Sequence, residues 1–139
     1  MTAFLRLLAL SFLLGIGGRA SYAEWVPIDG TYQSPGLRTV YIEPASIRRE
    51  GNLSTISILI DWRSMQGGRS PTRFYSTTFT KQFDCSEKRV RLLAATDFYG
   101  HMGSSEPIGG SVATTESHWR DVEPKSLDQG LMEAACRKE

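Results

Sequence analysis

Two histidines and two cysteines are the residues of this 139-residue chain best suited to bind a metal or attack a substrate. His101 lies in the glycine-rich stretch YGHMG, and His118 directly precedes a tryptophan. The His101-Met102 pair could act as copper or haem ligands, but a metal site needs several ligands at a fitting spacing. We therefore predict an exposed loop histidine at 101, a polar neighbour of a packed tryptophan at 118, and no metal or cofactor.

The two cysteines, Cys85 and Cys136, have neither the C-x-x-C spacing of redox motifs nor a neighbouring histidine. In an exported chain an even number of cysteines indicates a disulfide, and two cysteines allow only one pairing. We predict a structural Cys85–Cys136 bond. A reactive pair or a metal site is the alternative interpretation.

Sequence motifs of known catalytic sites are absent, including G-x-S-x-G, H-E-x-x-H and the phosphate-binding loop. The glycine-rich run at residues 109–111 is followed neither by a lysine nor by a predicted helix, so it is a weak candidate for a phosphate-binding site. Paired carboxylates for acid–base chemistry could meet only after folding. We predict that the protein is not an enzyme.

Positive charge is concentrated between residues 62 and 91, which carry seven basic and two acidic residues. Guanidinium groups bind carboxylates and similar anions through paired hydrogen bonds and steer acidic partners. The segment therefore contains a candidate partner-binding patch for an acidic glycan or an acidic protein segment. The patch consists of three arginines in one hairpin loop: Arg63, Arg69 and Arg73.

The alternative for these charges is internal neutralisation. The predicted disulfide would draw the Cys85 end of the hairpin toward a C-terminal helix that bears Asp128 and Glu133. Surface ion pairs formed there would contribute only about 0–1 kcal/mol each. The three arginines lie at the far end of the hairpin, which this arrangement would leave free.

The first 23 residues have the features of a cleaved export signal. Arg6 supplies a positive start, Leu7–Gly18 is uncharged, and Ser21 and Ala23 are small residues at the expected cleavage site. A membrane span needs about 20 apolar residues, so no transmembrane anchor is expected after cleavage. We predict a signal peptide at residues 1–23 and a single domain at residues 24–139.

The net charge of the predicted domain argues against one class of partner. Arg6 and Arg19 lie in the signal, so residues 24–139 keep 14 basic against 15 acidic residues. Domains that bind nucleic acid are normally strongly basic. We predict no nucleic-acid partner.

Apolar residues alternate with polar ones along three runs, which predicts half-buried antiparallel strands. A shorter strand is expected at residues 38–42, edge strands at 24–28 and 112–115, and a loop at 101–111. The connections are too short for parallel crossovers, so we expect a meander of about five to six strands. The alternating residues are Ile56, Ile58, Ile60 and Trp62; Tyr75, Phe79 and Phe83; and Val90, Leu92, Ala94 and Phe98.

The C-terminal segment changes to a helical period. Ser126 is a suitable N-cap, and Gln129 completes a capping box. The fold class is therefore α+β: a small antiparallel sheet with a C-terminal α-helix packed on it and one disulfide. One helical face carries the apolar residues Leu127, Leu131, Ala134 and Ala135.

The stretch TVYIEPASIRREGN, residues 39–52, is predicted to be a structural turn rather than a binding site. We expect the strand to end near Glu43, because proline cannot extend a ladder through its nitrogen. The chain would then turn, return one isoleucine to the core, expose two arginines and reverse at a glycine. These turn residues are Glu43, Ser46, Ile47, Arg48, Arg49 and Gly51.

The order of VYIEPASIRREG, STISILIDW, FDC and W…EPKS…C resembles the bacterial surface-adhesin protein E-like family over residues 25–136. The resemblance implies a small antiparallel sheet with a C-terminal helix and the Cys85–Cys136 bond. It also implies export to the periplasm or cell surface of a Gram-negative bacterium, where some relatives bind host matrix proteins. The family pattern has aspartate where Glu43 stands and glycine where Lys125 stands.

From these features we predict an exported binding module of the cell envelope, an adhesin that contacts host matrix or other envelope macromolecules without catalysis. The partner is expected to be a protein or an acidic glycan, and an exposed sheet edge would also permit a homodimer. The alternative is a periplasmic enzyme or enzyme inhibitor with an unrecognised site. A deep cleft with convergent polar groups would favour an enzyme, whereas an aromatic- or arginine-rich patch would favour binding.

Overall fold

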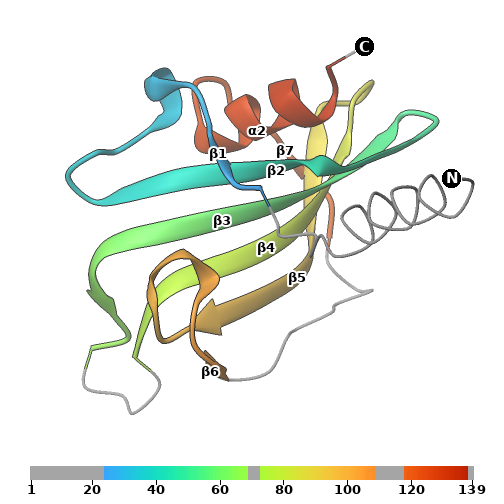
Figure 1. The fold of residues 1–139 in the computed structure, drawn as a ribbon. Helices are drawn as coiled ribbons and strands as arrows, with labels where there is room; N and C mark the ends of the chain where they lie inside the picture. Colours follow the sequence, from blue (N-terminus) through green and yellow to red (C-terminus); the bar gives the residue numbers. More distant parts are fainter. Residues whose placement is uncertain (1–23, 69–72, 109–117, 138–139) are drawn as a thin grey trace, which may run out of the picture.

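The computed structural model describes residues 24–68, 73–108 and 118–137, so the predicted signal and the strand expected at 112–115 lie outside the described residues. The strands form one antiparallel sheet whose order follows the chain from β1 to β6, with β7 paired to β5 (Figure 1). The predicted α+β fold with a meander sheet is confirmed. The strands are β1 (Val26–Pro27), β2 (Arg38–Glu50), β3 (Leu53–Gln66), β4 (Phe74–Asp84), β5 (Arg89–Phe98), β6 (Pro107–Ile108) and β7 (Arg120–Asp121).

One face of the sheet forms the core together with the helix α2 (Leu127–Ala135). The alternation along β3 buries Ile56 and Ile58 on this face, as predicted. Leu131 of the helix is buried against the same cluster, and Phe83 of β4 is completely buried in it. The core therefore lies between the sheet and a single helix.

The predicted disulfide is present and joins the end of β4 to the C-terminal cap of α2. Cys85 and Cys136 have a Cα–Cα distance of 5.8 Å. A second link between sheet and helix is a hydrogen bond from the buried Ser54 hydroxyl of β3 to the Ala135 carbonyl, 2.6 Å long. Because both links lie near the end of α2, they hold that end on the sheet.

The helix begins at the predicted N-cap. The Ser126 hydroxyl accepts a hydrogen bond from the Gln129 backbone N–H at 3.3 Å. The Gln129 side chain accepts from the Lys125 N–H at 2.7 Å, one residue before the position that a capping box would use. Lys125 itself has a φ of 63°, in the left-handed region that favours glycine.

Replacement of Lys125 by glycine is expected to raise the free energy of unfolding by about 1 kcal/mol. The left-handed conformation costs a residue with a Cβ about 1–2 kcal/mol, and the greater freedom of glycine in the unfolded chain offsets part of the gain. Urea denaturation followed by circular dichroism measures the change. Lys125→Ala, which keeps the Cβ, should give no gain, and equal stabilisation by alanine would contradict this account.

The prediction that a strand ends near Glu43 was wrong, because β2 continues to Glu50 through a bulge. The pairing with β3 shifts between Glu43 and Arg48. The Ser46 hydroxyl spans the bulge, donating to the Glu43 carbonyl at 2.6 Å and accepting from the Ser57 N–H at 2.9 Å. Serine thus replaces the ladder hydrogen bonds that the bulge interrupts.

The rest of the turn motif agrees with its predicted structural role. Ile47 packs against the core, and Gly51 has a φ of 62° where the chain reverses. The two arginines are exposed, as predicted, but each binds backbone carbonyls. Arg48 donates to Ala45 and Ile47, and Arg49 donates to Gly51 and Cys136.

A second bulge makes the predicted alternation along β5 wrong beyond its middle. Thr80 pairs with Ala94, whereas Lys81 pairs with Leu92, so Leu93 is an extra residue. The extra residue places Ala94 on the face opposite Leu92. The loop expected at residues 101–111 was also only partly correct, because it contains the 3-10 turn η2 (His101–Gly103) and β6.

Candidate binding surface

The end of the β3–β4 hairpin that lies away from the disulfide is at the lower left of Figure 1. Arg63 is in β3 and Arg73 directly precedes β4, while Arg69 lies outside the described residues. Both described arginines are exposed. Arg63 donates to the Pro35 carbonyl at 3.2 Å. Neither forms an ion pair with another described residue.

Three basic residues near the Cys85 end of the hairpin have acidic partners, whereas Lys88 has none among the described residues. Asp128 of α2 pairs with Lys81 at 2.7 Å and with Arg120 at 3.0 Å. Arg89 lies 3.5 Å from Asp84 across the β4–β5 turn. Internal neutralisation therefore occurs at this end of the hairpin, and the far end keeps its positive charge.

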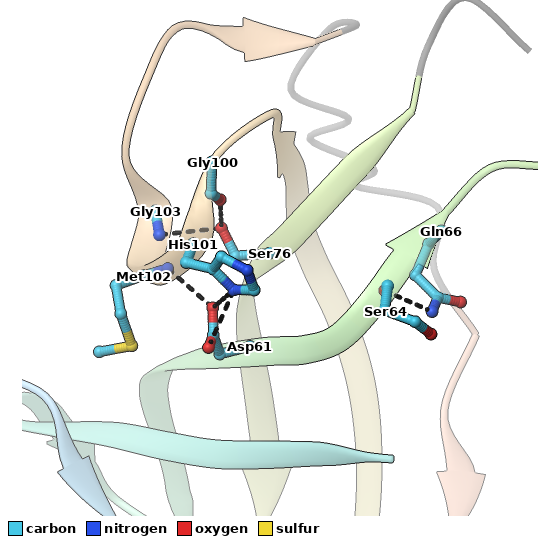
Figure 2. Close-up of polar contacts among 8 residues, drawn as sticks. All are labelled: Asp61, Ser64, Gln66, Ser76, Gly100, His101, Met102 and Gly103. Atoms are coloured by element: carbon cyan, nitrogen blue, oxygen red, sulfur yellow. Dashed lines mark hydrogen bonds and ion pairs between the residues drawn. The ribbon is translucent and has the colours of Figure 1, made fainter.

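A polar cluster fixes the turn η2 against β3 and β4 (Figure 2). The Asp61 carboxylate of β3 lies 3.1 Å from His101 Nδ1 and accepts a 2.8 Å hydrogen bond from the Met102 N–H. The Ser76 hydroxyl of β4 donates to the Gly100 carbonyl at 2.6 Å and accepts from the Gly103 N–H at 2.9 Å. Two neighbouring strands thus hold the turn at four points.

The same turn covers part of the sheet face opposite α2. Leu59 of β3 points away from the helix and is nevertheless completely buried. A Cβ added to Gly103 would lie 3.6 Å from its side chain, which places the turn directly over it. Anchoring by Asp61 therefore also protects an apolar residue from water.

An imidazole oriented by a carboxylate is the geometry of a general base, so His101 is the residue with most catalytic potential. Its ring packs on Tyr75 with 4.4 Å between ring centroids, and about half of its side chain is exposed. Among the described residues, the side chain of His101 hydrogen-bonds to the Asp61 carboxylate, which also accepts from a backbone N–H. The arrangement fits a loop anchor better than a nucleophile-activating pair.

His118 is exposed and lies away from this cluster, beside β7. The neighbouring Trp119 ring lies 4.7 Å from the Arg91 guanidinium and 5.6 Å from that of Arg89. Across residues 24–68, 73–108 and 118–137, no three His, Cys, Asp or Glu side chains gather closely enough to hold a metal ion. The absence of a metal stays a prediction. No helix in these ranges has the length and apolar character needed to cross a membrane.

Three exposed apolar side chains lie in segments that contact β3 or β4. Leu37, Tyr99 and Met102 are 49%, 53% and 41% exposed. Leu37 accepts a backbone hydrogen bond from Arg63, and the other two flank or belong to η2. Arginine, methionine and aromatic residues are enriched at protein interfaces. We define the hairpin-end surface as Leu37, Arg63, Arg73, Tyr99, His101 and Met102.

The arginines of this surface were found from the sequence, but its apolar members were not. Leu37 follows a glycine, and Tyr99 to Gly103 contains two glycines in five residues. Glycines favour turns, so a large apolar side chain beside them lies outside the alternating pattern that buries apolar residues in strands. This context could have indicated that the side chain is exposed.

Comparison with known proteins gave one family and several solved structures. The family model for surface-adhesin protein E matches residues 25–137. A crystal structure of protein E from Haemophilus influenzae is similar at a TM-score of 0.57 and 10% identity, over 84% of this chain and 90% of that one. Protein E from a non-typeable strain of the same species gives a TM-score of 0.51 and 11% identity, over 80% and 74% of the two chains. No curated protein matches.

Proposed function

Because the chain belongs to the surface-adhesin protein E family, we propose that it is an exported binding module that contacts an acidic macromolecule through its hairpin-end surface. Residues 1–23 direct it to the periplasm or cell surface of a Gram-negative bacterium. The partner is an acidic glycan or an acidic segment of a host matrix or envelope protein. Binding requires neither catalysis nor a metal or cofactor.

The observation that carries this proposal is the uneven pairing of charge along the β3–β4 hairpin. Lys81 has an acidic partner, whereas Arg63 and Arg73 form no ion pair among the described residues. Unpaired guanidinium groups attract anions over about 8–10 Å at physiological ionic strength. The exposed Tyr99 and Met102 of the hairpin-end surface supply apolar contact area, which electrostatic attraction alone does not provide.

The enzyme alternative rests on the Asp61–His101 pair. Asp61 also accepts from the Met102 N–H, and the turn it fixes covers Leu59, so a structural requirement already accounts for the carboxylate. An enzyme would need a further group positioned at His101. The proposal therefore assigns the pair to the shape of the binding surface.

Simultaneous change of Arg63, Arg69 and Arg73 to glutamate is expected to weaken binding to heparin by about tenfold or more, because charge-assisted hydrogen bonds contribute about 1.5–3 kcal/mol each. The affinity of the unmodified protein should also fall as salt is raised. Titration of immobilised heparin at several salt concentrations measures both effects. Thermal unfolding of the triple variant should be almost unchanged.

A matched control carries the same change of net charge elsewhere. Lys88, Lys125 and Arg137 are exposed and form no ion pair with other described residues, so their combined change to glutamate should leave most of the heparin affinity intact. Equal losses of heparin affinity in the two variants would mean that the effect depends on net charge alone. An affinity that is insensitive to salt, or a loss of thermal stability without a loss of affinity, would contradict the proposal.

A further inference from the structure

A groove of about 930 Å³ lies between β1, the outer edge of β2 and α2, away from the hairpin-end surface. Ligand pockets commonly enclose about 300–1,000 Å³, so this groove is large enough for a small molecule or a short peptide. Its floor is apolar and includes Ile42, Ile47 and Ala134. Val26 of β1 also lines it and is 39% exposed, which leaves apolar surface in contact with water.

Small helix residues and a short edge strand keep the groove open. The helix wall includes the small residues Gly130, Ala134 and Ala135, which project little into it. At one end the Tyr32 ring lies on Gly130, where an added Cβ would come within 2.5 Å of the ring. β1 pairs with only two residues of β2, so it does not cover the remaining outer edge.

The groove has an acidic end and a basic end. Asp29 and Glu133 lie near Tyr32, whose hydroxyl donates to Glu133 at 3.2 Å. Burial of the Tyr32 hydroxyl and then the neighbouring negative charges of Glu133 and Asp29 raise the pKa of Tyr32. At the other end Arg49 donates to the Cys136 carbonyl at 3.3 Å, beside Arg137. None of these four forms an ion pair with another described residue.

The spacing of the two ends matches a very short extended chain. Gly130, under Tyr32, and Ala135, the last residue of α2, are five positions apart, about 7.5 Å along the helix axis, and Arg137 follows two residues beyond the helix. Three residues of extended polypeptide span about 10 Å. A free peptide of this length carries an ammonium group at one end and a carboxylate at the other.

We propose that the groove binds a free peptide of three to four apolar residues, with its ammonium group at Asp29 and Glu133 and its carboxylate at Arg49 and Arg137. The side chains of the peptide cover Ile42, Ile47 and Val26. A fatty acid would satisfy the two arginines, but it would place its apolar tail against two carboxylates, so a peptide is the better chemical match.

The test uses the protein exported and processed with its own leader, labelled with ¹⁵N and titrated with the tripeptide Val-Leu-Val. Amide shifts are expected in Val26–Tyr32, Ile42–Arg49 and Gly130–Arg137. Acetylation of the amino end, or amidation of the carboxyl end, should weaken binding by about tenfold, since each removes a charge-assisted contact.

Two variants and one matched control separate recognition from folding. Arg137→Gln removes a guanidinium that forms no ion pair with the described residues and should weaken binding of the free tripeptide about tenfold. Val26→Glu places a charge on the exposed floor and should abolish binding. Arg73→Gln makes the same chemical change as Arg137→Gln at the hairpin-end surface and should leave peptide affinity unchanged, so this site and the proposed acidic-partner site succeed or fail separately.

Several results would overturn the proposal. The first is that millimolar tripeptide causes no amide shifts in the groove residues. The second is that a peptide blocked at both ends binds as tightly as the free tripeptide. The third is that Val26→Glu leaves binding unchanged. Shifts at the same residues that depend on protein concentration without peptide would instead assign the groove to a second copy of this chain. If palmitate shifts the amide signals of the same residues and binds more tightly than the tripeptide, the groove would instead be assigned to an amphiphilic anion.

Discussion

Replacement of both Cys85 and Cys136 by alanine is expected to lower the free energy of unfolding by about 4 kcal/mol. The bond joins residues 51 positions apart, and it restricts the unfolded chain by closing that loop. It also holds a helix of nine residues, which is too short to be stable without tertiary contacts. Urea denaturation of the variant and of the unmodified protein measures the loss.

Chemical reduction gives an independent control for the cysteine replacement. The unmodified protein in excess dithiothreitol should unfold at the same urea concentration as the double-alanine variant, and dithiothreitol should not affect the variant. A loss below about 1 kcal/mol would mean that the loop model of disulfide stabilisation does not describe this protein. Helical circular dichroism should fall before the sheet signal in the reduced protein.

Replacement of Phe83 by alanine is expected to lower the free energy of unfolding by about 3–5 kcal/mol. The Phe83 side chain is completely buried, and its β4 position pairs with Ser54 of β3 and Val90 of β5. Truncation leaves a cavity in the core near the Cys85 end of β4, which neighbouring strands cannot close without breaking their pairing. Thermal and urea unfolding measure the effect.

Phe79 provides the matched control for Phe83. It occupies the same face of β4 but is only partly buried at the margin of the core. Phe79→Ala removes the same atoms and should therefore cost clearly less than Phe83→Ala. Equal costs would show that loss of the aromatic ring, rather than the depth of burial, determines the change in stability.

The sheet and helix were predictable because their residues repeat at the periods of their backbones. Ile56 and Ile58 alternate with polar residues, and that alternation is sufficient to assign the buried face. The bulges were not predictable. Leu93 is an apolar residue among apolar residues, so nothing in its type marks it as extra. Pro44 predicts the end of a strand, although a proline within a bulge at a sheet edge interrupts no ladder.

The candidate surface could be predicted only where one residue type is concentrated along the chain. Arg63 and Arg73 were found from such a concentration of charge. Asp61 and His101 are 40 residues apart, and their contact depends on the packing of η2 across two strands. Sequence periodicity describes neighbours on one element, so it carries no information about this kind of long-range contact.

The agreement between sheet order and chain order from β1 to β6 has a consequence for the timing of folding. A chain delivered amino-end first can add each strand to the one that arrived before it, because every pairing is local. The helix is different, since its contacts with Tyr32 and Ser54 span 101 and 81 residues. Until α2 arrives, Ile56 and Ile58 face the surroundings uncovered. The interval between β5 and α2 is therefore the period in which a chaperone has apolar surface to hold.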